Sequence, residues 1–325
     1  MNNILITGAT GYVGCEVVIQ LKKLGKKVTA LGRTVPKEEI NFIQADLTDQ
    51  EGLKRALKDK SYDCIMHIAS LPGDTGNPLQ MVKVNINGCQ NILEFARESR
   101  VKRFVLASSL SAYEWYPGTK FNPPDYSPVD EKHPCRPKDM YSSTKRMQEL
   151  LALTYYYQYK VPVTILRLTA VVGLGGKGGG RSWREFAESL AEGKRIQIPH
   201  FIPEELCHYI DKRDVARMFI AAAEHPKAIG EIFNCAGPEP IRGFEFATIV
   251  KELVPDIKIE YGFPWSMAQG KEMAIDMTKA EKLIDFKPIY PMTDTIKSIK
   301  DWIDSGGLEK ETVKKESFGD GVEEN

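Results

Sequence analysis

The chain opens with a strand-like run that leads directly into a glycine-rich turn, and this feature restricts the fold more than any other. The run is Asn3–Thr7 (NILIT), the turn is GATGYVG, and apolar side chains at helical spacing follow over residues 12–24. Glycines between a strand and a helix let the backbone approach a pyrophosphate, which the helix N-terminus binds through free N–H groups and its dipole. The spacing is GxxGxxG rather than GxGxxG, but the flanking strand and helix are the context that a dinucleotide-binding turn requires. A tight turn without a ligand is the alternative.

Short apolar runs alternate with helical patterns over the first half of the chain. The further predicted strands are 27–31, 41–44, 64–68, 103–107 and 163–168, and the further predicted helices are 50–57, 79–99 and 140–159. Alternating strands and helices indicate βαβ units, whose right-handed crossovers place helices on both faces of a parallel sheet. The predicted fold class is therefore α/β, with a Rossmann-type doubly wound parallel sheet.

The sequence changes character after residue 172. The stretch 173–181 (GLGGKGGGR) predicts an irregular loop, because glycine loses more backbone entropy on ordering than other residues. A predicted helix at 211–224 and a strand at 231–234 then lead back to the main sheet. We expect a dinucleotide-binding domain of residues 1–172 to which 208–236 return, a smaller C-terminal substrate-binding lobe of 173–207 and 237–307, and a flexible tail of 308–325.

The composition argues against several classes of protein. Lys and Arg together number 44, as do Asp and Glu, so the net charge of zero disfavours a general nucleic-acid binder or a binder of acidic membranes. No apolar run approaches the roughly 18 residues that span a bilayer, and we expect no signal peptide. The six cysteines are scattered, without a CxxC pair or zinc-type spacing. We therefore expect reduced thiols, no metal site and a cytoplasmic location.

A second motif, YSSTK, places two ionisable side chains on one face of the predicted helix 140–159. Tyr141 and Lys145 lie four residues apart, so they are neighbours on the helix surface. The lysine cation favours the phenolate and lowers the tyrosine pKa, which lets a phenol act as acid and base near neutral pH. A surface pair is the alternative. Ser109 follows the predicted strand 103–107, at the edge where parallel sheets bind ligands, so its hydroxyl can hold a substrate oxygen beside Tyr141.

These motifs and their order resemble the extended short-chain dehydrogenase/reductase family, also called the NAD-dependent epimerase/dehydratase group, from residue 1 to about 305. The matching segments are TGATGYVG (7–14), ADLTD (45–49), HIAS (67–70), VNINGCQNIL (84–93), SSLSAY (108–113), YSSTK (141–145), ILRLTAVVG (165–173) and IDMTKAEKLIDFKP (275–288). The resemblance implies that Tyr141 is the catalytic acid/base, that Lys145 tunes it and binds the nicotinamide ribose, and that Ser109 orients the substrate oxygen.

The resemblance also assigns residues to the cofactor. The resemblance implies that the glycine turn binds the pyrophosphate, that residues 46–47 lie near the adenine, and that residues 68–70 run along the cofactor. Besides Tyr141 and Lys145, the cofactor-binding residues that it implies are Gly8, Thr10, Gly11, Tyr12, Val13, Gly14, Asp46, Leu47, Ile68, Ala69, Ser70 and Leu168.

The end of the predicted strand 27–31 indicates which dinucleotide is bound. NAD-specific members carry an acidic residue there, which accepts hydrogen bonds from the ribose hydroxyls. This chain has Gly32 followed by Arg33. A carboxylate would repel a 2′-phosphate, whereas a glycine leaves room and a guanidinium binds it with two hydrogen bonds. We therefore expect a preference for NADP(H); the alternative is that Arg33 stacks on the adenine while NAD(H) also binds.

Departures from the family pattern restrict the substrate. Leu110 and Ser111 replace the acidic pair of sugar dehydratases. Ala170 stands where nucleotide-sugar enzymes carry asparagine, and Cys207 where they carry arginine, so groups that would bind a nucleotide diphosphate are missing. We therefore expect a smaller sugar-like or ketone substrate. The candidate substrate contacts are Ser111, Glu114, Arg181 and His208, with a solvated loop arginine as the alternative for Arg181.

Three functions fit these residues. The first is an NADP-preferring oxidoreductase that moves a hydride between nicotinamide and a carbon bearing a hydroxyl or carbonyl group. The second is a sugar epimerase that uses the same residues and retains its NAD(P). The third is a non-catalytic NADP-sensing protein, against which the intact Ser109, Tyr141 and Lys145 argue. Members of the family commonly form dimers, so the resemblance also implies a homodimer through the predicted helices 79–99 and 140–159.

Overall fold

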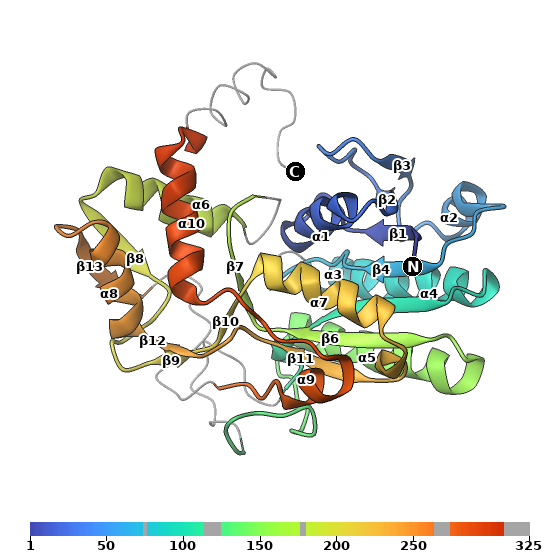
Figure 1. Ribbon diagram of the computed structural model, residues 1–325. Helices are drawn as coiled ribbons and strands as arrows, with labels where there is room; N and C mark the ends of the chain where they lie inside the picture. Colours follow the sequence, from blue (N-terminus) through green and yellow to red (C-terminus); the bar gives the residue numbers. More distant parts are fainter. Residues whose placement is uncertain (74–76, 114–124, 176–179, 263–273, 309–325) are drawn as a thin grey trace.

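The computed structural model describes residues 1–73, 77–113, 125–175, 180–262 and 274–308. Its centre is a sheet of seven parallel strands in the order β11-β6-β5-β4-β1-β2-β3 (Figure 1). The strands are β1 (Asn3–Thr7), β2 (Lys27–Gly32), β3 (Asn41–Gln44), β4 (Cys64–His67), β5 (Arg103–Ser109), β6 (Val163–Leu168) and β11 (Ile232–Cys235). The strand order reverses between β1 and β4, which is where doubly wound sheets bind ligands. The predicted α/β fold with a Rossmann-type sheet is confirmed.

Side chains of the central strands alternate between two helical layers. Ile4 and Ile6 of β1 pack in a cluster with α1 (Tyr12–Lys23) and α7 (Lys212–Glu224). Leu5, between them, packs in a cluster with α4 (Gly88–Glu98) and α5 (Met140–Tyr159). A strand buried on both faces produces this pattern, because successive side chains point to opposite sides of the sheet. The helix α2 (Gln50–Leu57) lies beside α4 on the second side.

Another apolar cluster lies beyond the carboxyl ends of the strands, at the left of Figure 1. Its helices are α6 (Gly180–Glu192), α8 (Gly243–Leu253) and α10 (Met292–Asp304). Its short strands pair as β7 (Ala170–Val172) with β10 (Tyr209–Asp211), β8 (Arg195–Ile198) with β13 (Lys258–Tyr261), and β9 (Leu206–Cys207) with β12 (Ile241–Arg242). Trp183, Phe186 and Leu190 form the apolar stripe that fixes α6 to this cluster.

Two sequence predictions of element extent are wrong. The predicted single helix 79–99 consists of α3 (Pro78–Val82), a π-helical turn (Lys83–Asn87) and α4. Apolar spacing does not reveal the π turn, in which Asn85 is buried and makes polar contacts with other segments. The predicted irregular loop 173–181 extends two residues too far, because residues 180 and 181 belong to α6. The packing of the apolar stripe of α6 outweighs the low helix propensity of its first residue, a glycine.

Three further observations concern the membrane, the cysteines and metal binding. Among the described residues, no helix is both long and apolar enough to cross a bilayer. All six cysteines lie in described segments and are free thiols. Within the same segments, no group of three or more His, Cys, Asp or Glu residues is arranged to hold a metal ion.

Candidate active site

The glycine turn is folded so tightly that its first and third glycines cannot be replaced without overlap. Gly8 has a φ of 76°, and an added Cβ would lie 2.6 Å from the backbone nitrogen of Ala69. At Gly14 an added Cβ would lie 2.0 Å from the carbonyl oxygen of Gly8. Gly11 closes the turn by donating its N–H to that carbonyl at 2.9 Å. The first and third glycines therefore let the end of β1, the start of α1 and the chain after β4 meet at one point.

The N-terminus of α1 has the properties of an anion site. Gly11 is its N-cap, no side chain of the described residues caps it, and its first turn holds no acidic residue. The first N–H groups of a helix lack partners within the helix and attract negative charge. Thr10, Tyr12 and Val13 are half-buried around this end. These residues fit the pyrophosphate of a dinucleotide.

The chain after β4 runs beside the turn through Ile68, Ala69 and Ser70, which are all half-buried. Thr7 at the end of β1 fixes this segment: its carbonyl accepts from Ile68 N–H at 3.2 Å, and its hydroxyl accepts from Ala69 N–H at 3.3 Å. The same hydroxyl is 2.8 Å from Nδ1 of His67. Burial, with a smaller contribution from the charge of Lys145, lowers the pKa of His67 to about 3, so this imidazole is neutral.

The end of β2 is open. An added Cβ at Gly32 would meet no heavy atom of the described residues within 4 Å, and Arg33 is exposed. Asp46 is also exposed, after β3, and Leu47 beside it is buried. Partial burial raises the pKa of Asp46, but hydrogen bonds from Thr48 and the charges of Arg33 and Lys83 hold it below its usual value. Leu168 ends β6 opposite Ser109 of β5, at the carboxyl edge of the sheet.

Lys145 is buried against the sheet, one helical turn after Tyr141. It is only 3% exposed, and its Nζ lies 6.0 Å from the centre of the Tyr141 ring. The ammonium donates to the carbonyl of Ala107 in β5 at 2.8 Å and to Oε1 of Gln148 at 3.0 Å. Burial lowers the pKa of Lys145 to about 8, against smaller opposing effects of Cys89 and Glu149. Lys145 therefore places a cation close to the phenol, which favours the phenolate.

Ser109 ends β5, two residues beyond the carbonyl that holds Lys145. Its hydroxyl oxygen accepts from Ser111 Oγ at 2.9 Å and from Ser111 N–H at 3.2 Å. A serine hydroxyl that accepts two hydrogen bonds keeps its own proton for donation. Ser111 is 1% exposed, and its two hydrogen bonds hold the Ser109 hydroxyl oxygen in place; its contact with substrate stays a prediction. Helix α5 packs on both β5 and the turn that contains Ser111, so the structure brings the three catalytic candidates to one edge of the sheet.

The sequence analysis missed a polar network behind this triad. Glu149 is fully buried and accepts from Arg167 Nε at 2.9 Å, Arg167 Nη2 at 2.8 Å and Ser108 Oγ at 2.6 Å. Burial raises its pKa, but Arg167 and Ser108 lower it further, so the carboxylate is ionised. The Arg167 guanidinium also lies 4.5 Å from the centre of the Tyr113 ring. A signal existed in the sequence, since Glu149 follows Lys145 by one helical turn on the same face.

A second missed contact joins Lys145 to the π turn. Gln148, which accepts from Lys145, donates its amide to the carbonyl of Asn85 at 2.8 Å. The Asn85 side chain in turn donates to Thr144 Oγ1 at 3.0 Å and accepts from Leu71 N–H at 2.8 Å. The π turn, α5 and the segment after β4 are therefore fixed to one another around the lysine.

The remaining substrate candidates lie as follows. His208 is 3% exposed, and both ring nitrogens have backbone partners: the carbonyl of Gly237 at 3.0 Å and the N–H of Ile275 at 3.0 Å. Its position indicates a structural link, which the sequence gave no means of distinguishing from a ligand contact. Glu114 lies outside the described residues. Arg181 belongs to α6, and its side chain is outside what the structure describes. Cys207 is 1% exposed and packs in the apolar cluster of the smaller lobe, whereas Ala170 is half-buried.

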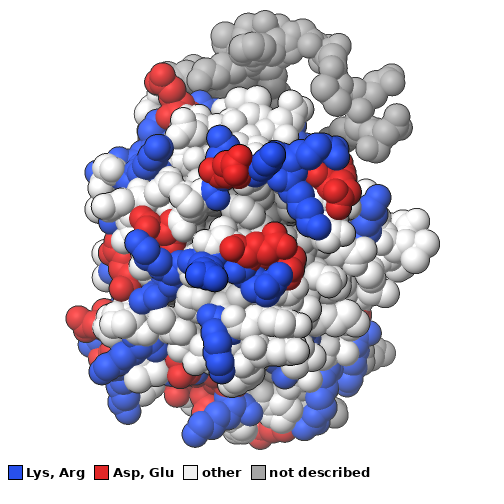
Figure 2. Space-filling model, turned by 90° about the vertical axis from the view of Figure 1, so that its right-hand side faces the viewer, with Lys and Arg blue, Asp and Glu red and all other residues white. Residues whose placement is uncertain are grey.

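A surface groove lies away from this site. It has a volume of about 550 Å³ and lies between α2 and α4, lined by residues such as Leu53, Leu57 and Phe95. None of the catalytic candidates lines it. On the face shown in Figure 2, basic and acidic side chains are interspersed, so that face offers no broad field of one sign.

Comparison with known proteins agrees with this geometry. A sequence profile of the NAD dependent epimerase/dehydratase family matches residues 4–236. The chain belongs to this family. It is 29% identical to the UDP-glucuronate 4-epimerase of Thermodesulfobacterium geofontis, over 93% of this chain and 96% of the relative. Membership confirms the resemblance inferred from the motifs and makes the chain an NAD-dependent enzyme of the short-chain dehydrogenase/reductase type.

Solved structures show the same fold. The L-threonine dehydrogenase of Clostridium difficile superimposes with a TM-score of 0.79 at 26% identity, over 94% of this chain and 99% of the other. The UDP-glucose 4-epimerase of Thermotoga maritima, solved with UDP-glucose, gives a TM-score of 0.80 at 22% identity, over 94% and 99% of the two chains. Proteins named for different reactions thus share this architecture, so the fold does not decide between redox and epimerisation chemistry.

Proposed function

We propose that this enzyme transfers a hydride between NADP(H) and a carbon that bears a hydroxyl or carbonyl group in a small sugar-like or ketone substrate. The observation that carries the proposal is the buried Lys145 ammonium, 6.0 Å from the Tyr141 ring and fixed to the same strand that ends in Ser109. A cation, a phenol and a hydroxyl donor converge at the edge of the sheet where the glycine turn opens.

Each residue has a separate role in the proposed reaction. When bound, the nicotinamide supplies the hydride acceptor or donor. Tyr141 removes the proton from the substrate hydroxyl during oxidation and returns it during reduction. Ser109 donates a hydrogen bond to the same oxygen and stabilises its developing negative charge. Lys145 keeps Tyr141 acidic enough for this exchange, because a neighbouring cation lowers the pKa of a phenol.

The proposed preference for NADP(H) rests on the end of β2. Gly32 has open space where NAD-specific members carry a carboxylate, and the exposed Arg33 follows it. Packing inside the protein gives no reason for a glycine at this position. A ligand group does, because the 2′-phosphate needs space and a cation.

The proposed substrate lacks a nucleotide diphosphate. Nucleotide-sugar enzymes place an arginine where this chain has Cys207, and Cys207 lies buried in an apolar cluster. A thiol in this place supplies no positive charge for a diphosphate. Ala170 likewise supplies no amide.

A second candidate function is a sugar 4-epimerase that retains its cofactor. Similarity over nearly the whole chain to a UDP-glucuronate 4-epimerase favours it. The same Tyr141, Lys145 and Ser109 serve both reactions, because epimerisation also begins by oxidising a secondary alcohol. The two candidates differ in whether the cofactor leaves during each turnover.

The deciding experiment identifies the nucleotide and its exchange. The protein is purified without added cofactor and denatured, the released nucleotide is identified, and NADPH and NADH are titrated into nucleotide-free protein. We expect empty protein that binds NADPH at least about tenfold more tightly than NADH, a difference of about 1.4 kcal/mol. Gly32→Asp should reverse this order, whereas Gly32→Ala should preserve it. Tightly held, non-exchanging NAD in the purified protein would instead favour the epimerase candidate and contradict the preference for NADP(H).

We also propose that the protein is a cytoplasmic homodimer. Large apolar side chains are exposed on α3 and α5, among them Leu79, Met147 and Leu150 at 79%, 47% and 50%. A second copy packed on these helices would remove them from water. The mass in solution, measured by light scattering, decides the oligomeric state. A monomer at micromolar concentration contradicts the dimer.

A further inference from the structure

Residues 171–174, which follow β6 and include the end of β7, are tied to the glycine turn by Tyr12. Tyr12 is the first residue of α1. Its hydroxyl lies 2.9 Å from the carbonyl oxygen of Gly173 and 3.2 Å from that of Val171, and it donates to them. The residue whose backbone begins the anion-binding turn thus also holds the chain that leads toward the smaller lobe.

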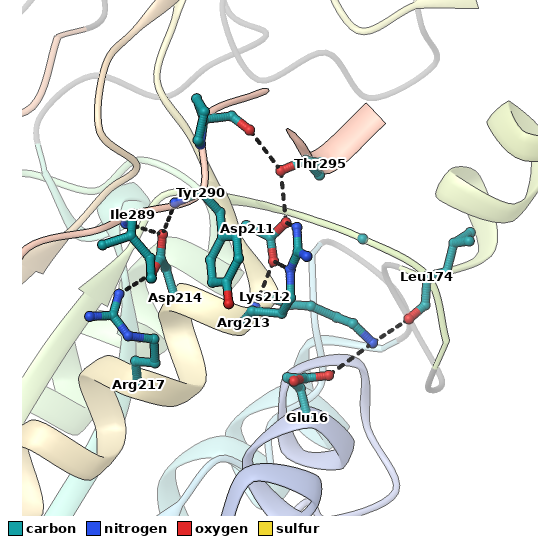
Figure 3. Close-up of polar contacts among 12 residues, drawn as sticks. Glu16, Leu174, Asp211, Lys212, Arg213, Asp214, Arg217, Ile289, Tyr290 and Thr295 are labelled. Atoms are coloured by element: carbon teal, nitrogen blue, oxygen red, sulfur yellow. Dashed lines mark hydrogen bonds and ion pairs between the residues drawn. The ribbon is translucent and has the colours of Figure 1, made fainter. Parts of the chain in front are cut away.

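Lys212 makes a second attachment to the same segment, as Figure 3 shows. It is the first residue of α7, and its ammonium donates to the carbonyl of Leu174. The same Nζ lies 3.5 Å from Oε2 of Glu16, one turn after Tyr12 on α1. The two charged side chains are only 15% and 11% exposed, so solvent screens this pair less than a surface pair.

The backbone of the segment is adapted to the lysine. Gly173 has a φ of 143°, and an added Cβ would lie 2.9 Å from Cγ of Lys212. A side chain at residue 173 would therefore displace the methylene stem of Lys212. Glycine at this position lets the stem cross the segment before the ammonium reaches Leu174.

The chain around the backbone of Lys212 is also fixed (Figure 3). Asp211 caps α7 and accepts from Arg213 N–H at 2.7 Å, from the Arg213 guanidinium at 2.6 Å and 2.9 Å, and from Thr295 Oγ1 of α10 at 2.7 Å. The Arg213 guanidinium lies 3.9 Å from the centre of the Tyr290 ring. Lys212 thus extends from a rigid point between the sheet and the smaller lobe toward α1.

We infer that Lys212 is a positioning residue for the bound dinucleotide: together with Tyr12 it holds residues 171–174 against the first two turns of α1 and so slows release of the nucleotide. The inference rests on the proposed binding of a pyrophosphate at the N-terminus of α1. Because Tyr12 contributes to that N-terminus and to the segment, loosening the segment also loosens the anion site.

The test measures nucleotide dissociation rather than turnover. Protein loaded with NADPH is mixed with excess NADP+, and the loss of protein-bound NADPH fluorescence gives the release rate. Lys212→Met should speed release by about tenfold, the effect of losing one hydrogen bond from a charged group. Lys212→Arg, which keeps the cation and the donor, should restore a rate within about twofold of the wild type.

Lys279→Met is the matched control. Lys279 of α9 (Thr278–Ile284) also binds one backbone carbonyl, that of Ile232 at 2.6 Å, and one carboxylate, that of Glu231 at 2.8 Å. Its partner strand β11 is separated from β1, which leads into the glycine turn, by β6, β5 and β4, so the loss of Lys279 should leave the release rate unchanged. Equal acceleration in both variants would show a general loss of rigidity and overturn the inference.

The remaining outcomes separate the inference from the proposed function. If the wild type binds neither dinucleotide, the proposed function and the inference both fail. If it binds but Lys212→Met releases NADPH at the wild-type rate, only the inference fails. Should Lys212→Met not fold, Tyr12→Phe removes the other attachment with a minimal change and should also speed release. In the double variant, an effect smaller than the product of the two single effects shows that both side chains hold one segment.

Discussion

At the scale of the single residue, the chemistry depends on how Lys145 is held. An ammonium group has three donors, and Ala107 and Gln148 accept two of them. These contacts compensate for burial, which nevertheless lowers the lysine pKa to about 8. Below that pH the side chain is a cation beside Tyr141, and its charge is little screened because it is buried. Burial therefore makes the lysine a stronger influence on the phenol than a surface lysine at the same spacing.

Removing the Tyr141 hydroxyl tests this arrangement. We expect Tyr141→Phe to lower kcat by about 10²–10⁴-fold, the usual contribution of a positioned acid/base. Nucleotide affinity should stay within about threefold, because the ring remains and the glycine turn is untouched. Steady-state kinetics combined with nucleotide titration measures both quantities.

Tyr157→Phe is the control for this substitution. Tyr157 lies on the same helix but is 65% exposed, so loss of its hydroxyl should leave kcat unchanged. A Tyr141→Phe enzyme with wild-type turnover would exclude Tyr141 as the acid/base, whatever the nucleotide affinity.

At the scale of the element, the buried Glu149–Arg167 pair joins α5 to β6. The pair is 0% and 2% exposed, and Ser108 of β5 adds a third contact. A helix that carries the catalytic tyrosine and lysine is thereby fixed to two strands of the sheet. Such a pair is costly to break, because the remaining partner is left buried without compensation.

We expect Glu149→Gln to destabilise the protein by about 3–5 kcal/mol, measured by urea unfolding. Glu188→Gln is the matched control. Glu188 is likewise a helical glutamate paired with an arginine, Arg184 of the same helix, but it is 48% exposed. That change should cost less than about 1 kcal/mol. Similar losses for the two variants would show that the buried network contributes no more than a surface pair.

Local patterns in the sequence were sufficient to predict most of the elements, whereas the catalytic roles of Ser109, Tyr141 and Lys145 stay predictions. The bounds of α2 and α5 agree with the predicted 50–57 and 140–159, because apolar periodicity and the caps Asp49 and Asp139 are encoded locally. The place of Glu149 on the Lys145 face of α5 could be predicted from the sequence, but its partners Arg167 and Ser108 could not, because they come from separate strands. The π turn was missed for the same reason: Asn85 contacts Leu71 and Thr144, which are remote in sequence.

At the scale of the whole molecule, a few buried polar side chains attach the smaller lobe to the sheet. Asn234 of β11 donates to the carbonyls of Val129 at 3.0 Å and Asp276 at 3.1 Å, and accepts from the Tyr113 hydroxyl at 2.5 Å. His208 makes a corresponding link between Gly237 and Ile275. The segment around residue 275 is thus held from both sides, so the seating of the lobe depends on His208 remaining an acceptor.

This dependence predicts how stability changes in acid. Burial lowers the pKa of His208 to about 4, below its ordinary value of about 6.5. Between these values the unfolded chain binds more protons than the folded one, so the stabilisation by neutral His208 is complete above pH 6.5 and is lost as the pH falls to about 4.

His208→Gln cannot titrate. The difference in unfolding free energy between wild type and His208→Gln should therefore shift by about 3 kcal/mol against the wild type from pH 7 to pH 4. Urea unfolding across this range measures the shift. Parallel curves would show that His208 is protonated equally in both states, which contradicts a neutral imidazole that accepts from Ile275.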